Sequence, residues 1–178
     1  NRGTIMGIAT SLTKVTRKLE EAVTGAAPDV DILDTLKEEH EEVAALLQRL
    51  VDGKSTAERR SLLKQIKSAL VPHTRAEEKV LYDAIIAVRK KGVQKDGEEG
   101  YLEHGLADRM LATLSKTSKL MSPEFGAAAK VLKELVEHHV QEEENAVWSD
   151  AKKYFSTEER QVMNRKYLKL KKSVKIPA

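Results

Sequence analysis

The chain has 178 residues, of which 40% are hydrophobic, 33% charged and 4% aromatic, and its formal net charge is +3 at pH 7. It contains no cysteine, which excludes disulfides, zinc–thiolate sites, iron–sulfur clusters and thiol nucleophiles. No apolar run approaches the roughly 20 residues of a membrane span, and the N-terminus lacks the apolar region of a secretory signal, so we expect a soluble, cytoplasmic protein.

The N-terminal part of the chain predicts two amphipathic helices. Over residues 4–24, apolar residues recur at alternating steps of three and four, which is typical of a helix with one apolar face. The stretch GAAPD at 25–29 contains glycine and proline and is expected to end this helix. A second helix is predicted over 30–52, with His40 among the leucines of its apolar face.

The middle of the chain predicts one long helix over about 56–91. His73 and Glu77 fall on its apolar face, and Pro72 is expected to kink the helix just before them. Lysine, glycine, glutamine and aspartate residues at 90–100 then predict a loop.

Two further long helices follow. The first is predicted over about 98–121 and carries His104. The sequence SPE comes next, with Ser122 as the expected N-cap, and the following helix carries His139 and Glu143 on its apolar face. The sequence STEE then opens a last helix, which is short and basic.

No segment has the period-two alternation of a strand, so the chain is predicted to be all-α. Four long helices with short connections predict an up-down-up-down four-helix bundle, with one extra helix at each end. The expected organisation is an N-terminal helix and linker at 1–29, the bundle at 30–155, and a basic C-terminal helix and tail at 156–178.

Two decapeptides share one pattern, HTRAEEKVLY at 73–82 and HVQEEENAVW at 139–148. Each places a histidine four residues ahead of a glutamate, a spacing that puts both side chains on one face of a helix. The helix before each decapeptide adds one histidine on an apolar face, His40 or His104. The two halves of the bundle therefore repeat, and the repeat predicts that all four histidines face the same interior.

Six ionisable side chains fall on apolar stripes where leucine or valine would be expected; they are His40, His73, Glu77, His104, His139 and Glu143. Burying a carboxylate costs roughly several kcal/mol unless its charge is compensated. Two cations, each bound by imidazole nitrogens and bridged by both carboxylates, would compensate it. Such mixed nitrogen and oxygen ligands suit iron, manganese or zinc better than calcium or magnesium. The sequence thus predicts a two-metal site, and the alternative is a hydrogen-bonded polar network in the core.

Polar residues beside this stripe have other expected roles. His138 and Glu142 lie on a polar face and are expected to be solvated. Glu78 and Glu144 lie next to the stripe and are expected either to support the site from outside or to face solvent. The aromatic residues that end the two decapeptides are expected to pack in the core.

The pattern H…HxxxE…H…HxxxE over residues 33–155 resembles the hemerythrin-like domain, also called the HHE cation-binding domain. PHTRAEEKVLY and EHHVQEEENAVW are similar to the motifs of its bacterial members. The resemblance implies a non-haem di-iron centre, with two iron ions joined by an oxo or hydroxo bridge, inside a four-helix bundle. It also implies bridging by Glu77 and Glu143 and terminal ligation by the four histidines, His40, His73, His104 and His139.

The chain departs from oxygen-carrying hemerythrins at two positions. Those proteins have a fifth histidine ligand where this chain has Asp108, which either approaches one iron or pairs with a nearby arginine or lysine. They also place the last carboxylate five residues after its histidine, a position held here by Glu144. We assign the ligand to Glu143, because it mirrors Glu77 and lies on the apolar face.

The resemblance implies a protein that binds a small oxidant or gas, namely dioxygen, nitric oxide or peroxide, in a stress response or in redox or oxygen sensing. Whether it is an enzyme stays open: catalase- or peroxidase-like decomposition of peroxide fits the centre, and no catalytic residue is assigned. The alternative is iron handling, or a metal-dependent interaction or sensor module without catalysis.

Two segments, one near each end of the chain, bear on whether the protein binds partners. The helix over 4–24 is expected either to cover an apolar groove or to pair two copies in a homodimer. Arginine and lysine gather over 160–175, but only Tyr167 is an aromatic among them. We therefore expect this basic cluster to be solvated, with neither a nucleic acid nor a membrane as partner.

Overall fold

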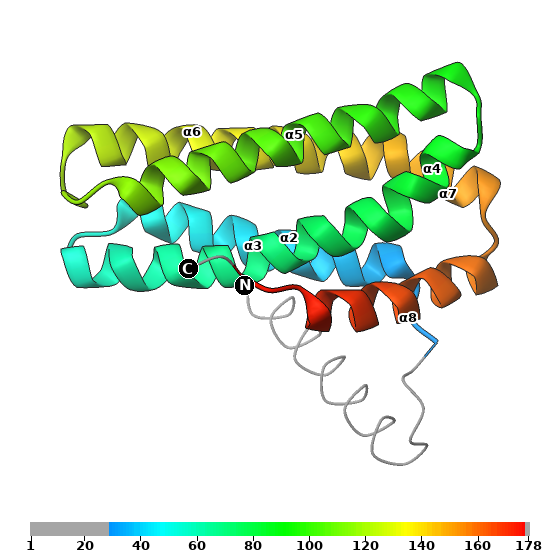
Figure 1. Cartoon of the computed structure of the whole chain (residues 1–178), viewed down its shortest axis with the longest axis horizontal. Helices are drawn as coiled ribbons and strands as arrows, with labels where there is room; N and C mark the ends of the chain where they lie inside the picture. The colour runs from blue at the N-terminus through cyan, green and yellow to red at the C-terminus, as the bar shows by residue number, and fades with distance from the viewer. Residues whose placement is uncertain (1–28, 177–178) are drawn as a thin grey trace, which may run out of the picture. The chain divides into compact units, whose positions relative to one another are not determined.

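The computed structural model describes residues 29–176, and these residues are helical except for short connections, with no strand among them. The described helices are α2 (Ile32–Asp52), α3 (Thr56–Glu77), α4 (Asp83–Ala87), α5 (Lys91–Lys116), α6 (Pro123–Glu142), α7 (Trp148–Tyr154) and α8 (Thr157–Ser173). Figure 1 shows α2, α3, α5 and α6 lying lengthwise, with successive long helices running in opposite directions. The all-α, up-and-down bundle is thus confirmed for this part of the chain. The predicted helix at 4–24, and any dimer formed through it, lie outside the described residues.

Side-chain caps define where several helices begin. The Asp31 carboxylate accepts a hydrogen bond from the Leu33 amide at the start of α2. Ser122 accepts one from the Phe125 amide at the start of α6, as predicted. Ser156 and Glu159 form a capping box that opens α8.

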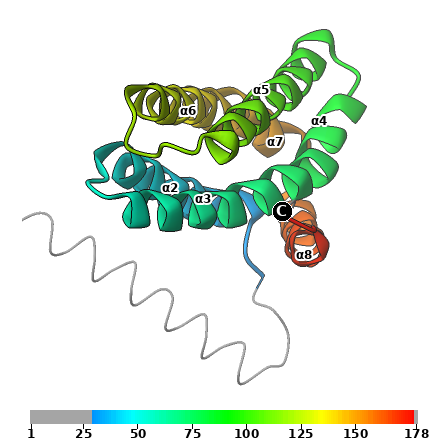
Figure 2. The same ribbon diagram turned by 60° about the vertical axis from the view of Figure 1, so that its left-hand side comes forward.

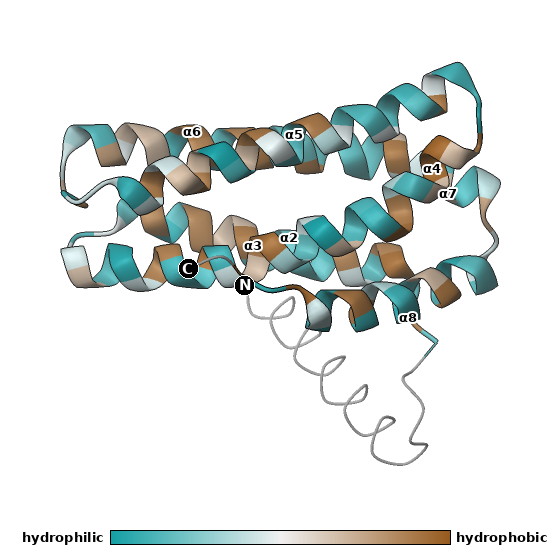
Figure 3. Ribbon diagram, viewed as in Figure 1, coloured by the Kyte–Doolittle hydropathy of each residue, from teal (hydrophilic) through white to brown (hydrophobic). Residues whose placement is uncertain are grey.

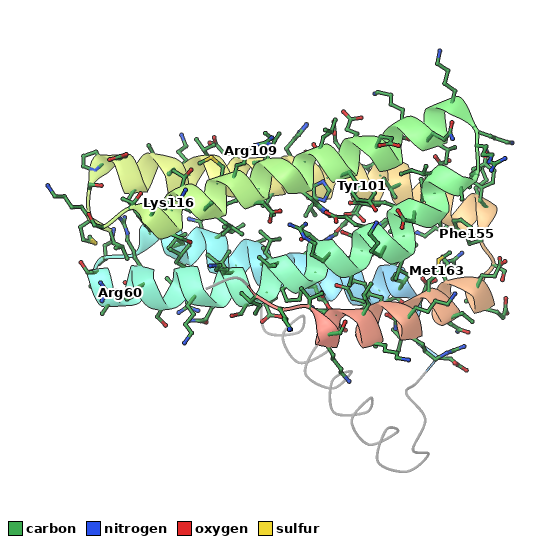
Figure 4. All side chains as sticks on the ribbon, viewed as in Figure 1. Arg60, Tyr101, Arg109, Lys116, Phe155 and Met163 are labelled. Carbon is green, nitrogen blue, oxygen red and sulfur yellow. The ribbon has the colours of Figure 1, made fainter. Side chains whose placement is uncertain are left out.

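The two helices that carry the repeated decapeptides, α3 and α6, both change from α-helical to π-helical geometry next to Glu77 and Glu143. The π segments are η1 (Glu78–Tyr82), which follows α3, and η2 (Glu143–Val147), which follows α6. The Tyr101 hydroxyl, labelled in Figure 4, lies 3.0 Å from the backbone carbonyl oxygen of Glu78 and satisfies it. π-helical turns are rare and occur often at functional sites. The two π segments occupy matching positions in the two halves of the bundle, so the internal repeat includes the backbone geometry next to the buried carboxylates.

The helix α3 continues through Pro72 without ending there.

The loop predicted at 90–100 is wrong, and so is the helix start predicted at 98. α5 begins at Lys91, and the chain turns just before it at Arg89, whose φ of 57° is left-handed. Two glycines of this stretch, Gly97 and Gly100, serve helix packing rather than a turn. A Cβ atom on Gly100 would lie 2.5 Å from Cε2 of Tyr82, so only glycine lets α5 approach that ring so closely.

Two apolar clusters fill the bundle on either side of the polar site. Along α2, for example, His40 lies between Leu36 of one cluster and Val43 of the other. Figure 3 shows hydrophobic residues alternating with hydrophilic ones along each long helix, as amphipathic packing requires. None of the helices within residues 29–176 combines the length and the apolar character needed to cross a membrane.

The last helix belongs to the same compact unit as the bundle. α8 packs against α2 and α3, and Figure 2 shows it nearly end-on beside them. Its Tyr167 is fully buried in one of the two apolar clusters.

Candidate metal centre

The six ionisable residues of the predicted site come together in the bundle core. Their side chains are almost inaccessible to solvent, with residue exposures from 0% for Glu77 to 7% for His139. They come from every long helix of the bundle: α2 carries His40, α3 His73 and Glu77, α5 His104, and α6 His139, with Glu143 at the start of η2. The up-and-down topology brings these helix segments to the same level of the bundle.

The four histidines form two pairs. The ring centroids of His40 and His73 are 5.1 Å apart, and those of His104 and His139 are 4.7 Å apart. The Nε2 atoms of His104 and His139 lie 3.1 Å from each other. Each pair therefore aims two ring nitrogens at a common point, the arrangement that a metal ion with imidazole ligands needs.

The two carboxylates each reach both histidine pairs. Oε2 of Glu77 lies 3.4 Å from Nε2 of His73 and 3.6 Å from Nε2 of His104. In the mirrored half of the centre, Oε2 of Glu143 lies 3.4 Å from Nε2 of His139 and 3.6 Å from Nε2 of His40. Each carboxylate thus stands between one histidine of either pair, which is where a bridging ligand belongs.

Several of these inward atoms have no hydrogen-bond partner. They are Nε2 of His40, both carboxylate oxygens of Glu77 and Oε2 of Glu143. A buried polar atom without a partner costs about 1–3 kcal/mol, and more when it is charged, so such atoms need another partner. Two groups have ligand atoms within 4.8 Å of one another, His40–His73–Glu77 and Glu77–His104–His139. The donor set therefore fits metal cations, and Glu77 belongs to both groups.

A second layer of carboxylates holds the outer nitrogen of every ring. The four Nδ1-to-carboxylate contacts are His40–Glu144 at 3.1 Å, His73–Glu39 at 3.0 Å, His104–Glu78 at 3.2 Å and His139–Glu103 at 2.6 Å. When Nδ1–H donates to a carboxylate, the lone pair stays on Nε2, which faces the centre. The same contact fixes the orientation of the ring. All four histidine rings are thus held with Nε2 toward the centre, where they could hold a metal.

Sequence reasoning missed two of these supports, Glu39 and Glu103. A signal existed, because each immediately precedes an inward histidine, in the Glu-His dipeptides at 39–40 and 103–104. Glu78 and Glu144, whose role the sequence left open, both contact a histidine. Of these two, Glu78 is buried, whereas the side chain of Glu144 is 30% exposed.

The protein environment moves the histidine pKa values apart. Burial alone would lower the pKa of His73, but the charge of Glu77 and the hydrogen bond with Glu39 outweigh it and raise this pKa to about 9. Burial is likewise outweighed at His139, where contacts with Glu103 and Glu143 raise the pKa to about 10. At His104 burial prevails and lowers the pKa to about 4.

The two central carboxylates also differ. Burial, reinforced by the negative charge of Glu143, raises the pKa of Glu77 to about 8. Burial would raise the pKa of Glu143 too, but the contact with His139 at 3.4 Å and the charge of His40 hold it below its usual range. Protons thus balance the charges of the metal-free centre, and a bound cation would displace them.

Aromatic side chains close the centre on two sides. The Trp148 indole donates a hydrogen bond to Oε1 of Glu143 at 3.3 Å, and its ring stacks on His40 with centroids 6.0 Å apart. The Tyr82 hydroxyl lies 3.4 Å from Nε2 of His139. Both aromatic residues are buried, which confirms the predicted core packing, and both also make polar contacts with the site.

The last helix reaches the centre as well, through a residue that sequence reasoning did not assign to it. The Tyr167 hydroxyl donates to Glu39 at 2.6 Å and lies 3.0 Å from Nδ1 of His73. Lys171, one turn later, forms an ion pair with the same glutamate. No signal in the local sequence pointed to these contacts, because they depend on where α8 packs.

The residues expected outside the ligand set are found there. Asp108 forms an ion pair with Arg75, which also contacts Glu78 at 3.0 Å, so the ion-pair alternative for Asp108 is confirmed. The side chains of His138 and Glu142 are 60% and 48% exposed, as their polar face predicted.

Comparison with known proteins gives one family and one curated relative. Residues 31–151 match the family described as "Hemerythrin HHE cation binding domain". Over 131 residues the chain is 28% identical to a protein of Nostoc sp. (strain PCC 7120) described as a DNA nickase. That match covers 74% of this chain but only 36% of the Nostoc protein. No solved structure matches the chain.

Proposed function

Since the chain belongs to the hemerythrin HHE cation-binding domain family, we propose that it holds two iron ions and uses them to bind or decompose dioxygen, nitric oxide or peroxide. The observation that carries this proposal is the set of inward nitrogen and oxygen atoms that are buried without a hydrogen-bond partner. Metal cations would satisfy them, and imidazole with carboxylate is a ligand set that suits iron.

The proposed ligands divide into two ends and a bridge. His40 and His73 would hold one cation, and His104 and His139 the other. Glu77 and Glu143 would bridge them, because each carboxylate already stands between the two histidine pairs. Iron, when bound, would supply the redox chemistry, while the chain supplies ligand geometry and a dry surrounding.

A small cavity supports a ligand of a few atoms. Its volume is about 20 Å³, and all four histidines of the centre contribute to its lining together with aliphatic residues such as Val43, Leu70 and Val136. A cavity of roughly 10–15 Å³ suffices for one water molecule, so this space accommodates a diatomic gas or peroxide and nothing much larger. The aliphatic wall would keep bulk water from the ligand.

The test is the metal content and activity of protein isolated without chelators. We expect two tightly bound irons per chain with near-ultraviolet absorption bands, and oxygen release from added peroxide if the protein is catalytic. His73→Ala should lose tightly bound iron, whereas His138→Ala, outside the buried centre, should keep both ions. Folded protein that takes up no iron would refute the proposal, and turnover no faster than free iron would remove its enzymatic version.

A second candidate is a sensor or interaction module in which metal occupancy changes partner binding. The contact of Tyr167 with Glu39 and His73 favours it, because this contact couples α8 to one end of the centre. Limited proteolysis of the metal-free and iron-loaded protein tests it: cleavage within α8 should be slower with iron. Identical digestion of the two forms would count against the sensor.

The Nostoc relative makes DNA a partner to be tested. Lys166, Lys169 and Lys172 are exposed on α8 at three-residue spacing, so one face of this helix is basic. We nevertheless propose that the chain acts without nucleic acid, because the match covers only 36% of the protein described as a DNA nickase. DNA binding that weakens steeply with salt and is lost on changing these three lysines to glutamine would overturn this.

A further inference from the structure

A solvent-connected cavity lies against one side of the buried centre. Its volume is about 480 Å³, and Tyr82, His139 and Glu143 of the centre form part of its wall. Glu143 is only 2% exposed, and its Oε2 atom has no hydrogen-bond partner. Glu143 thus belongs both to the buried centre and to the wall of a cavity that reaches solvent, which marks a side from which a cation could arrive.

The outer part of this cavity is negatively charged. Asp96, Glu99, Glu103 and Glu142 line it, and the one lysine of the wall, Lys95, is paired with Glu99 at 3.3 Å. Burial, together with the charges of Asp150, Glu99 and Glu142, raises the pKa of Asp96, as expected where carboxylates crowd. The negative electrostatic potential of these carboxylates should raise the local concentration of cations at the opening of the cavity.

Three side chains within this cavity lie as metal ligands would. Nε2 of His138 is 3.4 Å from Oε1 of Glu142 and 4.0 Å from Oε1 of Glu103. The three residues offer ligand atoms that all lie within 4.8 Å of one another. His138 and Glu142 repeat the four-residue spacing of His139 and Glu143 one position earlier on the same helix, so an outer pair lies next to the inner one.

Glu103 joins the outer group to the buried centre. Its Oε2 atom faces Nδ1 of His139 at 2.6 Å, while its Oε1 atom faces His138. One carboxylate therefore supports an inner ligand with one oxygen and contributes to the outer group with the other. A cation held outside lies one side chain away from the centre.

Among the described residues, the other half of the bundle has no such group. In the repeat, Pro72 stands where His138 stands and Ala76 where Glu142 stands, so that half offers no outer ligands. Glu39, the counterpart of Glu103, is instead covered by Tyr167 and Lys171 of α8. Within residues 29–176, the exposed ligands therefore lie on the side of the centre where this cavity opens.

We propose that Glu103, His138 and Glu142 form an outer cation site, which takes a divalent cation from solvent and passes it to the buried centre. This proposal rests on the proposed function, in which the buried centre binds two metal cations. Three ligands at the rim of an open cavity, two of them half-exposed, make a weak site. Weak binding suits a site of transfer, because the cation must leave again for the stronger ligands inside.

The test uses Co²⁺ as the probe and the full chain stripped of metal. Uptake is followed by stopped-flow absorption, and the number of bound cations is measured by equilibrium dialysis. The variants His138→Ala and Glu142→Gln change exposed side chains and should fold normally. Glu134→Gln is the matched control, because it removes one exposed charge from the same helix outside the cavity.

We expect the wild type and Glu134→Gln to bind two cations tightly and a third weakly. His138→Ala and Glu142→Gln should lose the weak cation and fill the tight sites at least about tenfold more slowly, with the final tight number unchanged. Uptake at the wild-type rate in both variants, or an unchanged third cation, would overturn the proposal. A wild type that binds the weak cation but no tight pair would instead refute the proposed two-metal centre, so the two failures are distinguishable.

Discussion

The Tyr167 hydroxyl donates a hydrogen bond to the Glu39 carboxylate at 2.6 Å, and this contact joins α8 to the candidate metal centre. Glu39 in turn faces Nδ1 of His73 at 3.0 Å. A chain of two contacts therefore runs from α8 to a proposed ligand. Figure 1 shows that α8 comes last in the described part of the chain, so the centre is complete only when this helix has docked.

The first prediction concerns Tyr167→Phe, which removes the hydroxyl and keeps the ring. Loss of one hydrogen bond to a partly buried, charged acceptor should lower the free energy of unfolding by about 1–3 kcal/mol. Because Glu39 orients His73, cation affinity should also fall by about 10-fold or more. Chemical denaturation and competitive metal titration measure the two effects. Tyr154→Phe, on α7, is the matched control and should leave cation affinity unchanged; equal losses in both variants would contradict the argument.

The second prediction concerns Glu77→Gln, which keeps the shape of the side chain and removes its charge. Glu77 stands between the two histidine pairs, so its loss should affect both cations, whereas His73→Ala should weaken chiefly one. Burial raises the pKa of Glu77 to about 8, so in the metal-free protein this group is largely protonated at neutral pH. The metal-free stability of Glu77→Gln at pH 7 should therefore stay within about 1 kcal/mol of the wild type. Elemental analysis after loading measures the ions, and retention of two would remove Glu77 from the bridge.

The third prediction is that pH moves stability and metal affinity in opposite directions. The pKa values of His73 and His139 rise from 6.5 to about 9 and about 10, so their contribution to metal-free stability is complete below pH 6.5 and is lost as pH passes through those values. The raised pKa of Glu77 adds to the loss between pH 4.5 and 8, because there the folded protein holds a proton that the unfolded chain releases.

Between pH 6.5 and 9 the metal-free protein should therefore lose stability, by roughly 2–3 kcal/mol for each of these three groups. Cation affinity should rise over the same range, since binding displaces these protons. Urea denaturation of the metal-free protein and competitive Zn²⁺ titration at several pH values measure the two trends. Parallel trends would show that the protons and the cation do not compete for the same atoms.

The sequence predicted the bundle and the inner residues for one physical reason. A histidine or glutamate on an apolar stripe is costly in a core, so His40 or Glu77 among leucines and valines is visible from periodicity alone. Glu39 sits about 100° further round the same helix and looked like an ordinary surface residue. Its role depends on reaching a histidine of another helix, and periodicity within one helix holds no such information.

The misplaced loop at 90–100 has a related cause. Glycine-rich polar sequence usually indicates a turn, but here glycine lets two helices approach closely. Tyr167 was missed for the same kind of reason, because a buried tyrosine in a basic helix reveals its partner only when the helix is docked. What the sequence could not supply was therefore the contact between elements rather than the elements themselves.

The last prediction tests that close approach. Gly100→Ala would place a methyl group 2.5 Å from Cε2 of Tyr82, a distance at which α5 or the ring must move. The free energy of unfolding should fall by about 1–3 kcal/mol, as for other overpacked cores. The Tyr82 hydroxyl lies 3.4 Å from Nε2 of His139, so the absorption spectrum of Co²⁺-loaded protein should shift as well. Gly105→Ala is the control on the same helix: its methyl group would meet no atom within 4 Å, and alanine should stabilise the helix by up to about 1 kcal/mol. Equal stability of the two variants would mean that Gly100 is not required for the packing of α5 against Tyr82.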